Sequence, residues 1–392
     1  MAQRGKRNRK KKVLRKSRYY RQQQLKYLMI GAGILVLLLI VLLIRGCGSK
    51  ESKNVSSSGV NSQNETKEAQ AGEADAVELT VTPTPKMDPV SLTVSVVGDC
   101  TLGTDEYFDY DTSLNMYYEI NGADYFLANV KSIFSADDLT IANFEGTLTD
   151  SQERADKQFA FKAPASFADI LTAGSVEAVN TANNHSHDYG DQSFDDTLNA
   201  LDAVDMVHFG YDETAVMDVK GVKVGLVGIY ELNDHLGREE QLKQNIAKVK
   251  EEGAQLIIVI FHWGNEKETV PDENQTTLGR MAIDEGADLV CGHHPHVLQG
   301  IEVYKGKNIV YSLGNFCFGG NSYPSDMDTM IFQQTFTVDA EGVQNDNITN
   351  IIPCSVSSEY GYNNYQPTPA EGEEAERILQ KIQERSSWIS GN

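Results

Sequence analysis

Residues 256–264 read LIIVIFHWG, an apolar run that ends in a histidine, a tryptophan and a glycine. The same form recurs at 288–296, DLVCGHHPH, where three histidines follow a short apolar segment. Upstream, apolar segments again end in polar residues of the metal-ligand type, at 94–99 (VSVVGD), 139–145 (LTIANFE) and 178–185 (AVNTANNH). Short apolar runs of this length indicate buried strands. Five strands that each deliver Asp, Glu, Asn or His to their ends predict a layered α/β protein with a catalytic or binding centre.

Helical patterns alternate with these strands. Apolar residues recur at helical spacing in five segments, at residues 123–134, 165–173, 191–203, 239–251 and 276–285. The alternation predicts βα units around a largely parallel sheet or sandwich, with ligands collected beyond the strand ends. After Phe332 the pattern changes, and residues 332–338 and 347–353 predict a hairpin. Residues 371–386 predict a polar C-terminal helix.

The first 45 residues predict a membrane anchor. Residues 1–26 form a basic arm with twelve Lys and Arg and no acidic residue, and residues 27–45 contain an apolar run of 17 residues. This length is near the lower limit for a spanning helix, and the basic flank should stay in the cytoplasm. We therefore expect a single-pass protein of the cell membrane, with a cytoplasmic N-terminus and an extracellular C-terminal domain. The alternatives are a buried core helix, a cleaved signal peptide, or a lipoprotein site at Cys47 that Arg45 fits poorly.

The rest of the chain divides by composition. Residues 46–90 are rich in Ser, Asn, Gln and Glu and end in a Pro-rich stretch, which predicts a disordered tether. Residues 91–357 contain all five strand patterns and form the predicted folded domain, and residues 358–392 form a C-terminal tail and helix.

The charge of residues 46–392, the part expected outside the membrane, limits the classes of molecule that it can bind. Beyond Arg45 the chain carries 21 basic and 56 acidic residues, so its formal charge is 21 − 56 = −35. Such a surface disfavours nucleic acid and anionic membrane, and it would bind a polyanion only at a local positive centre such as a metal site. Four widely spaced cysteines of this part could form disulfides or remain buried thiols, namely Cys100, Cys291, Cys317 and Cys354.

Two strand ends offer carboxylates. Asp99 follows a buried strand, where a metal or a helix N-terminus would satisfy its charge, although a turn residue is the simpler alternative. Asn143 and Glu145 are two residues apart, so an extended segment points both side chains to one face. Capping of the strand end is the alternative for this pair.

Histidines follow three of the strands. Asn184 supplies a carbonyl oxygen and His185 a nitrogen ligand or a general acid, in a tight loop. His262 is either a ligand or a core histidine, and Trp263 beside it suggests a platform at the rim of a substrate site. His294 and His296 can project to one side of the chain and bind a metal through imidazole nitrogens.

One more candidate site residue, Asn315, lies at the end of a later strand. Asn315 follows a strand-like run at residues 309–313. Its amide could orient a ligand or a substrate, and a purely structural role in the loop is the alternative. We therefore regard Asn143, Trp263 and Asn315 as candidate substrate-binding residues.

These motifs together resemble the CapA family of poly-γ-glutamate capsule synthesis proteins, whose domain is similar to calcineurin-like metallophosphoesterases. The resemblance covers roughly residues 92–318 and rests on GD at 98–99, NFEG at 143–146, ANNH at 182–185, HWG at 262–264, HPHV at 294–297 and YSLGNF at 311–316. It implies a metallophosphoesterase-like α/β sandwich that follows one N-terminal transmembrane helix.

The resemblance also assigns roles to residues. It implies one or two divalent metal ions (Mn, Fe, Mg or Zn), held by Asp99, Glu145, Asn184, His262, His294 and His296. It implies that Asn184 and His185 act in catalysis. Two positions depart from the phosphoesterase pattern: Thr101 stands where a histidine is usual, and Glu145 replaces a bridging aspartate.

Three functions follow as expectations. The first is a metal-dependent hydrolase that acts in the metabolism of poly-γ-glutamate or a related anionic surface polymer, together with membrane synthase or export proteins. The second is a non-catalytic scaffold that binds the polymer or the synthase. The third is a general surface phosphatase.

Overall fold

The structure is a computed structural model that describes residues 88–344 and 346–389. The predicted basic arm, the predicted anchor and the predicted tether up to residue 87 lie outside the described residues. Within the two described ranges, no helix combines the length and apolarity that crossing a membrane requires.

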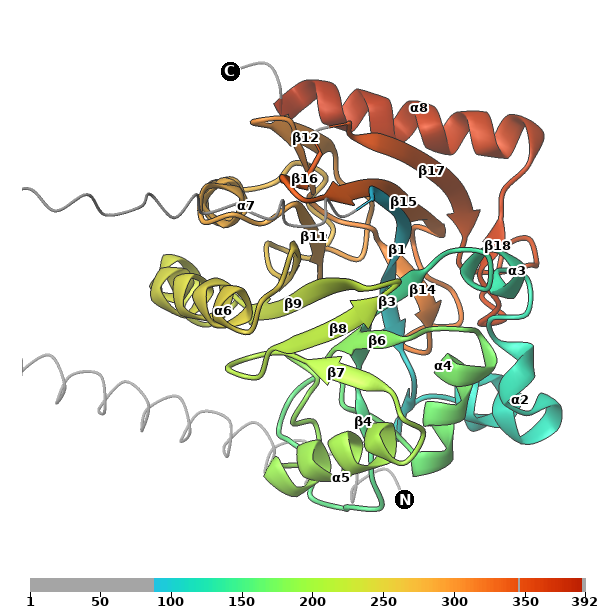
Figure 1. The fold of residues 1–392 in the computed structure, drawn as a ribbon. Coiled ribbons are helices and arrows are strands. Elements are labelled where there is room, and N and C mark those ends of the chain that lie inside the picture. Colours follow the sequence, from blue (N-terminus) through green and yellow to red (C-terminus); the bar gives the residue numbers. More distant parts are fainter. Residues whose placement is uncertain (1–87, 345, 390–392) are drawn as a thin grey trace, which may run out of the picture. The chain divides into compact units, whose positions relative to one another are not determined.

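The first sheet is built around β1 (Figure 1). Along the described chain its main path runs β18-β17-β15-β1-β3-β6-β7, and β14 and β16 pair with β1 and β15 outside this path. β1 is parallel to β3 and β14 and antiparallel to β15. The strands are β1 (Val90–Thr101), β3 (Leu139–Glu145), β6 (Ala178–Asn180), β7 (Val207–Phe209), β14 (Asn315–Phe318), β15 (Asp328–Asp339), β16 (Gly342–Val343), β17 (Ile348–Ser355) and β18 (Thr368–Pro369).

The second sheet has a parallel centre and antiparallel edges. Its order is β12-β13-β11-β10-β9-β8, in which β9, β10, β11 and β13 run parallel. The strands are β8 (Ala215–Val219), β9 (Val222–Tyr230), β10 (Leu256–His262), β11 (Leu289–His293), β12 (Ile301–Tyr304) and β13 (Lys307–Val310). A small third sheet contains β2 (Thr104–Asp105), β4 (Thr147–Leu148) and β5 (Phe161–Ala163).

The two large sheets pack face to face. Alternate residues of β1, among them Val94 and Val96, share one buried cluster with Leu226 of β9 and Ile260 of β10. Side chains of successive strand residues point to opposite faces, so Val97 joins a second cluster on the outer face of the first sheet. Burial on both faces explains why the strands have almost unbroken apolar runs.

Helices cover the outer faces (Figure 1). The helices that pack on the first sheet include α4 (Asp169–Ala173) and α5 (Asp191–Asp202), and those on the second sheet are α6 (Glu239–Glu251) and α7 (Glu273–Asp284). α8 (Gly372–Ile389) lies across β12 and β17 and buries Ile378 and Ile382. The shorter helices are α2 (Leu114–Asn121), α3 (Lys131–Phe134) and the 3-10 turns η1 (Tyr110–Thr112), η2 (Ala123–Tyr125), η3 (Ala165–Ala168) and η4 (His235–Arg238).

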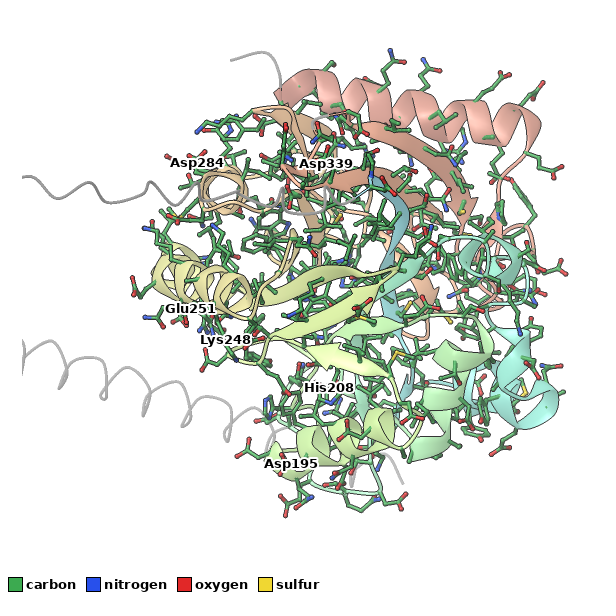
Figure 2. All side chains as sticks on the ribbon, viewed as in Figure 1. Asp195, His208, Lys248, Glu251, Asp284 and Asp339 are labelled. Atoms are coloured by element: carbon green, nitrogen blue, oxygen red, sulfur yellow. The ribbon has the colours of Figure 1, made fainter. Side chains whose placement is uncertain are left out.

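Charged side chains of these helices point outward (Figure 2). Asp195 of α5, Lys248 and Glu251 of α6 and Asp284 of α7 are exposed. The apolar faces of the same helices form the outer clusters. This amphipathic division is what the helical spacing in the sequence predicted.

One predicted helix is wrong. Residues 123–134 form the 3-10 turn η2, a series of turns, and then the single α-helical turn α3. Phe126, Val130 and Phe134 are nevertheless fully buried on one side. Consecutive turns place them there, because the amide of Val130 bonds to the carbonyl of Leu127, three residues back. The helical spacing of residues 123–134 therefore predicted correctly which side chains are buried. It predicted incorrectly that the backbone forms the hydrogen bonds of a continuous α-helix.

The four cysteines of the described domain are free and buried. Burial raises the pKa of the Cys291 and Cys317 thiols well above its usual value, so both are protonated thiols at neutral pH. The structure thus favours the buried-thiol alternative over a disulfide framework.

Candidate metal centre

The strand ends of both sheets meet at one edge of the sandwich. β1, β3 and β6 run in one direction, and so do β10 and β11. Parallel strands bring their carboxyl ends to the same edge, where functional groups collect in α/β folds. Asp99 of β1 contacts His293 of β11, and this contact joins the two sheets at that edge.

A buried trio lies at the centre of this edge. Asp99, Glu145 and His262 each offer a ligand atom, and these atoms all lie within 4.8 Å of one another. All three side chains are 0% exposed. A carboxylate pair with an imidazole is a donor set that suits a divalent transition metal.

The amide of Asn143 sits among the same atoms. Its Nδ2 lies 2.9 Å from Oδ1 of Asp99, 3.3 Å from Oε1 of Glu145 and 3.3 Å from Nδ1 of His262. Its Oδ1 accepts a hydrogen bond of 2.8 Å from Asn180. Asn143 is 0% exposed and does not line the cavity, and its amide contacts both carboxylates, while its role in binding substrate stays a prediction.

Three histidines surround Asp99. Nδ1 of His293 lies 3.1 Å from Oδ1 of Asp99, and Nδ1 of His296 lies 3.1 Å from Oδ2. Nδ1 of His296 also lies 2.9 Å from the amide oxygen of Asn315, and the predicted role of Asn315 in orienting a substrate stays a prediction. The ring of His294 is 4.9 Å from that of His262 and 5.6 Å from that of His296.

The Asn184–His185 loop brings in two further groups. The amide oxygen of Asn184 lies 2.8 Å from Nε2 of His262. Nδ1 of His185 lies 2.8 Å from Oδ2 of Asp188, and Lys157 donates to Oδ1 of Asp188 at 2.6 Å. Asp188 is 0% exposed, and it also accepts from the amide of Phe161 at 2.6 Å. The loop therefore fixes the imidazole of His185 through a buried carboxylate.

The two buried carboxylates of the centre, Asp99 and Glu145, have pKa values that are shifted in opposite directions. Burial and then the charge of Asp99 raise the pKa of Glu145 to about 8. Burial acts to raise the pKa of Asp99, but hydrogen bonds from His293 and His296 outweigh it and leave this pKa well below its usual value. A nearby cation would stabilise both ionised carboxylates.

The histidines differ in charge. Burial would lower the pKa of His296, but the hydrogen bond to Asp99 and the charge of Glu145 raise it to about 9. Burial and then the charge of His296 lower the pKa of His294 to about 3, and burial with the charge of His294 lowers that of His262. His262 and His294 are thus neutral at physiological pH, which is the form that ligates metals.

Unpartnered nitrogens support a metal at this place. Among the described residues, Nε2 of His293 and Nδ1 of His294 are buried and make no hydrogen bond. A buried polar atom without a partner costs about 1–3 kcal/mol. Together with the two carboxylates, these atoms fit a group that binds a divalent cation.

Trp263 is placed differently from the prediction. Its side chain is 0% exposed and stacks on Phe261 with ring centroids 4.2 Å apart. Its Nε1 donates to the carbonyl of Tyr311 at 2.8 Å. Trp263 belongs to the core of the second sheet, so the expected platform for substrate does not form at this residue.

Close backbone approaches hold the edge together. A Cβ on Gly98 would lie 2.2 Å from the carbonyl oxygen of Gly314, and a Cβ on Gly292 would lie 2.2 Å from that of Tyr311. Both contacts require glycine. The amide of Asp99 then bonds to the same Gly314 oxygen at 2.9 Å, which fixes the position of the carboxylate.

Sequence reasoning missed four residues of this network: Thr101, Lys157, Asp188 and His293. Thr101 donates to Oε2 of Glu145 at 2.8 Å. Thr101 and Glu145 are the two positions that depart from the phosphoesterase pattern. Their hydrogen bond is visible only in the structure, because the two residues lie far apart in the sequence. Three closely spaced histidines, His293, His294 and His296, look alike in the sequence, and the backbone geometry decides which partner each one meets.

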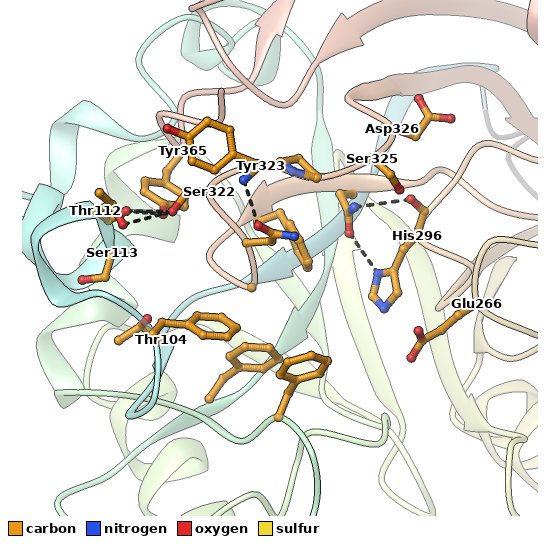
Figure 3. Close-up of a pocket in the computed structure, with 18 of the residues that line it drawn as sticks. Thr104, Thr112, Ser113, Glu266, His296, Ser322, Tyr323, Ser325, Asp326 and Tyr365 are labelled. Carbon is orange, nitrogen blue, oxygen red and sulfur yellow. Dashed lines mark hydrogen bonds between the residues drawn. The ribbon is translucent and has the colours of Figure 1, made fainter. Parts of the chain in front are cut away.

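A cavity of about 810 Å³ opens beside the centre (Figure 3). His185, His296 and Asn315 line it, and Glu266 lines it on the same side as His296 (Figure 3). The buried trio and Asn143 do not line this cavity. A ligand in the cavity would therefore meet His185 and His296 before it meets the carboxylates.

The profile of the family described as bacterial capsule synthesis protein PGA_cap matches residues 93–320. The chain belongs to this family. The match covers β1 to β14 and includes every candidate ligand of the metal centre.

Three relatives show the range of similarity to this PGA_cap chain. It is 34% identical to the PGA biosynthesis protein CapA of Bacillus subtilis over 60% of its own length and 66% of that protein. It is 31% identical to the capsule biosynthesis protein CapA of Bacillus anthracis, over 61% and 62% of the two chains. It is 28% identical to a probable polyglutamine synthesis accessory protein of Mycobacterium tuberculosis, over 46% and 56%. The chain thus spans less than two thirds of the length of these relatives.

Proposed function

We propose that this PGA_cap protein is a membrane-anchored extracellular protein that acts in the biosynthesis or export of poly-γ-glutamate or a related surface polymer through a metal-dependent hydrolase site. The names of its relatives support the polymer. The single observation that supports the site is the buried group of Asp99, Glu145 and His262. The two packed sheets flanked by helices are consistent with a metallophosphoesterase-like sandwich.

The residues that would hold the metal are Asp99, Glu145, Asn184, His262, His294 and His296, with His293 added by its contact to Asp99. When bound, Mn, Fe, Mg or Zn would polarise the scissile group and lower the pKa of a water molecule. His262 and His294 are already neutral, whereas His296 and Glu145 would each have to release a proton to the solvent when a metal binds. The amide of Asn143 donates a hydrogen bond to each of the two carboxylates.

His185 is the group placed to move a proton. Asp188 accepts from Nδ1, so Nε2 is the nitrogen that remains for the substrate. Lys157 balances the buried charge of Asp188. The ring of Phe161, 4.6 Å from that of His185, shields one face of the imidazole from water. Burial lowers the pKa of His185, so the ring is neutral and its Nε2 carries a lone pair. His185 would therefore first accept a proton at Nε2 and then return it to an ester or an amide leaving group.

The deciding experiment measures metal content and hydrolysis on the full chain. We expect about one or two equivalents of transition metal after reconstitution with Mn, Fe or Zn, and loss of the metal in His294→Ala plus His296→Ala. His235→Ala is the matched control, because His235 is an exposed histidine of η4 outside the centre. Absence of metal from a folded wild-type chain would refute the hydrolase part of the proposal.

Polymer production in cells separates chemistry from a scaffold role. We expect Asn184→Ala to abolish polymer while the protein still folds and still binds its membrane partners. Normal polymer in that variant would favour a scaffold. Turnover of phosphomonoesters without any effect of gene deletion on polymer would favour a general phosphatase.

A further inference from the structure

Lys267 is the one lysine or arginine that lines the cavity beside the metal centre, among the residues that the structure describes. It belongs to the loop that follows β10 and is exposed. Within residues 88–344 and 346–389, its ammonium makes no hydrogen bond, ion pair or ring contact. Lys381, by contrast, pairs with Asp326 at 3.1 Å. An unpaired ammonium that lines a cavity is available to a negatively charged ligand.

The backbone at Lys267 is held in an uncommon conformation. Its φ of 67° lies in the left-handed region, which side chains other than glycine rarely adopt. The amide of Lys267 donates to the carbonyl oxygen of Pro295 at 2.8 Å, and Nε2 of Gln299 donates to the carbonyl oxygen of Glu268 at 3.0 Å. Strain of this kind persists where surrounding contacts impose it, and it is typical of segments that bind ligands. The loop therefore presents the lysine side chain from a fixed point.

The hydrogen bond to Pro295 also places Lys267 next to the candidate metal centre. Pro295 lies between His294 and His296 in the chain, and both histidines have left-handed backbones, with φ of 92° and 57°. His296 lines the same cavity as Lys267. An anion bound to Lys267 would therefore lie close to the part of the substrate that reaches the metal centre.

The three carboxylates of the cavity lining do not neutralise the lysine ammonium. Asp326 pairs with Lys381, as described above. Glu266 lines the cavity on the same side as His296, which is protonated at neutral pH (Figure 3). Asp109 caps the 3-10 turn η1. The positive charge on the loop after β10 is thus left for a ligand.

The chemistry of a γ-linked glutamate chain fits this arrangement. Each of its residues has a free α-carboxylate, on the carbon that is bonded to the nitrogen of a backbone amide. One carboxylate therefore accompanies every amide bond that could be cut. An ammonium donates a charge-assisted hydrogen bond to a carboxylate, which is stronger than a bond between neutral groups. A flexible lysine acts as a point charge, so it tolerates the varied carboxylate orientations of a flexible polymer.

We propose that Lys267 recognises an α-carboxylate of the polymer beside the bond that is presented to the metal centre. This inference rests on the proposed function for the identity of the polymer and for the reaction. The role of Lys267 is to bind and not to react, so it is a specificity-determining residue. Binding of the carboxylate does not require the metal, so the two proposals can fail separately.

The test is calorimetric titration of the full chain in lipid nanodiscs, after metal removal with EDTA. The probes are a γ-linked glutamate trimer and the same trimer with its α-carboxylates converted to carboxamides. We expect Lys267→Ala to bind the charged trimer about three- to tenfold more weakly than the wild type does. The same variant should bind the amide trimer as the wild type does. Lys267→Arg keeps the positive charge and should retain most of the affinity for the charged trimer.

Lys131→Ala is the matched control. Lys131 of α3 is also exposed and its ammonium also has no partner among the described residues, but it lies outside the cavity lining. Its replacement should leave the affinity for the charged trimer unchanged. Absence of trimer binding to the wild type, an equal loss in Lys131→Ala, or an equal loss for both trimers in Lys267→Ala would each overturn the inference. Inorganic phosphate that binds more tightly than the trimer, and only when Lys267 is present, would also overturn it in favour of a phosphoester.

Kinetics separate this inference from the hydrolase proposal. After reconstitution with Mn, Lys267→Ala should raise the KM for the charged trimer about three- to tenfold and leave kcat within about twofold, because the contact is the same in the ground state and the transition state. If the metal-loaded protein hydrolyses nothing while Lys267→Ala still distinguishes the two trimers, only the hydrolase is refuted. If hydrolysis proceeds with an unchanged KM, only the role of Lys267 is refuted.

Discussion

Asp188 holds His185 by a contact of 2.8 Å between Oδ2 and Nδ1, and Lys157 holds Asp188 from the other side at 2.6 Å. Asp188 is fully buried, whereas His185 lines the cavity and the side chain of Lys157 is 29% exposed. The orientation of the imidazole therefore depends on a residue that no substrate touches. This separation makes the role of Asp188 testable without disturbing the metal.

Asp188→Asn should lower the turnover number by on the order of 10²-fold, because an amide can present its NH2 group to Nδ1 and favour the wrong tautomer of His185. Metal content should stay at the wild-type level, since Asp188 offers no atom to the buried trio. Steady-state kinetics and elemental analysis of the same sample measure both quantities. Loss of metal together with activity would show that Asp188 is structural and not a positioning residue.

Thr101 and Glu145 form a second testable pair. Thr101→Val keeps the shape of the side chain but leaves Oε2 of Glu145 without its hydroxyl donor. We expect the free energy of unfolding to fall by about 1–3 kcal/mol and the metal affinity to fall about 10–100-fold. Thr101→Ser retains the hydroxyl and should restore most of the affinity. Equal affinities in the valine and serine variants would contradict a role for this hydrogen bond.

Gly98→Ala tests the close approach that positions Asp99. The added Cβ would lie 2.2 Å from the Gly314 oxygen, so the strand must shift and the variant should lose about 1–3 kcal/mol of stability. Gly237→Ala is the control, because its Cβ would meet only Asp234 at 3.5 Å. Chemical denaturation of both variants measures the difference. Equal stability would mean that the β1 edge adapts without strain.

The free energy of unfolding should fall as the pH rises, because Glu177 is more easily protonated in the folded state than in the unfolded state. Burial raises the pKa of Glu177 to about 7, a rise that the amide of Thr140 reduces and the charge of Asp137 increases. The pKa of Glu177 in the folded state exceeds the usual value of 4.5 for a glutamate, so protonation of Glu177 favours the folded state. Its contribution is complete below about pH 4.5 and is lost as the pH rises through about 7.

Glu177→Gln keeps an acceptor for the Thr140 amide and removes the titration. Urea unfolding between pH 4.5 and pH 8 should therefore show a smaller decline in stability for this variant than for the wild type. Glu359→Gln, at an exposed position, should leave the decline unchanged. Parallel pH profiles for wild type and Glu177→Gln would refute the assignment.

The sequence patterns predicted where the strands and helices lie better than they predicted which side chains meet. The helix expected at residues 239–251 is α6, because Leu242, Ile246 and Val249 repeat at helical spacing on one buried side. The site residues could be found because each follows an apolar run. The sequence does not reveal side-chain direction, so Asn143 and Trp263 were assigned to substrate although both point into the interior.

The same limit explains the missed residues. Asp188 and Lys157 lie 31 positions apart, and no local pattern connects them. The lining of the cavity takes Phe108, Phe159 and Phe318 from three separate segments. Such groups form only when the β1–β14 pairing and the small third sheet bring those segments together.

β1 also sets the distance between the start of the strand at Val90 and the reactive edge at Asp99. The chain enters the described fold at the start of this strand, at Val90, and reaches Asp99 nine positions later. At ~3.3 Å per residue the reactive edge lies about 30 Å along the strand from the point of entry. Because β1 pairs with β3, β14 and β15, this separation is fixed, and it does not depend on the path of the predicted tether that precedes the strand.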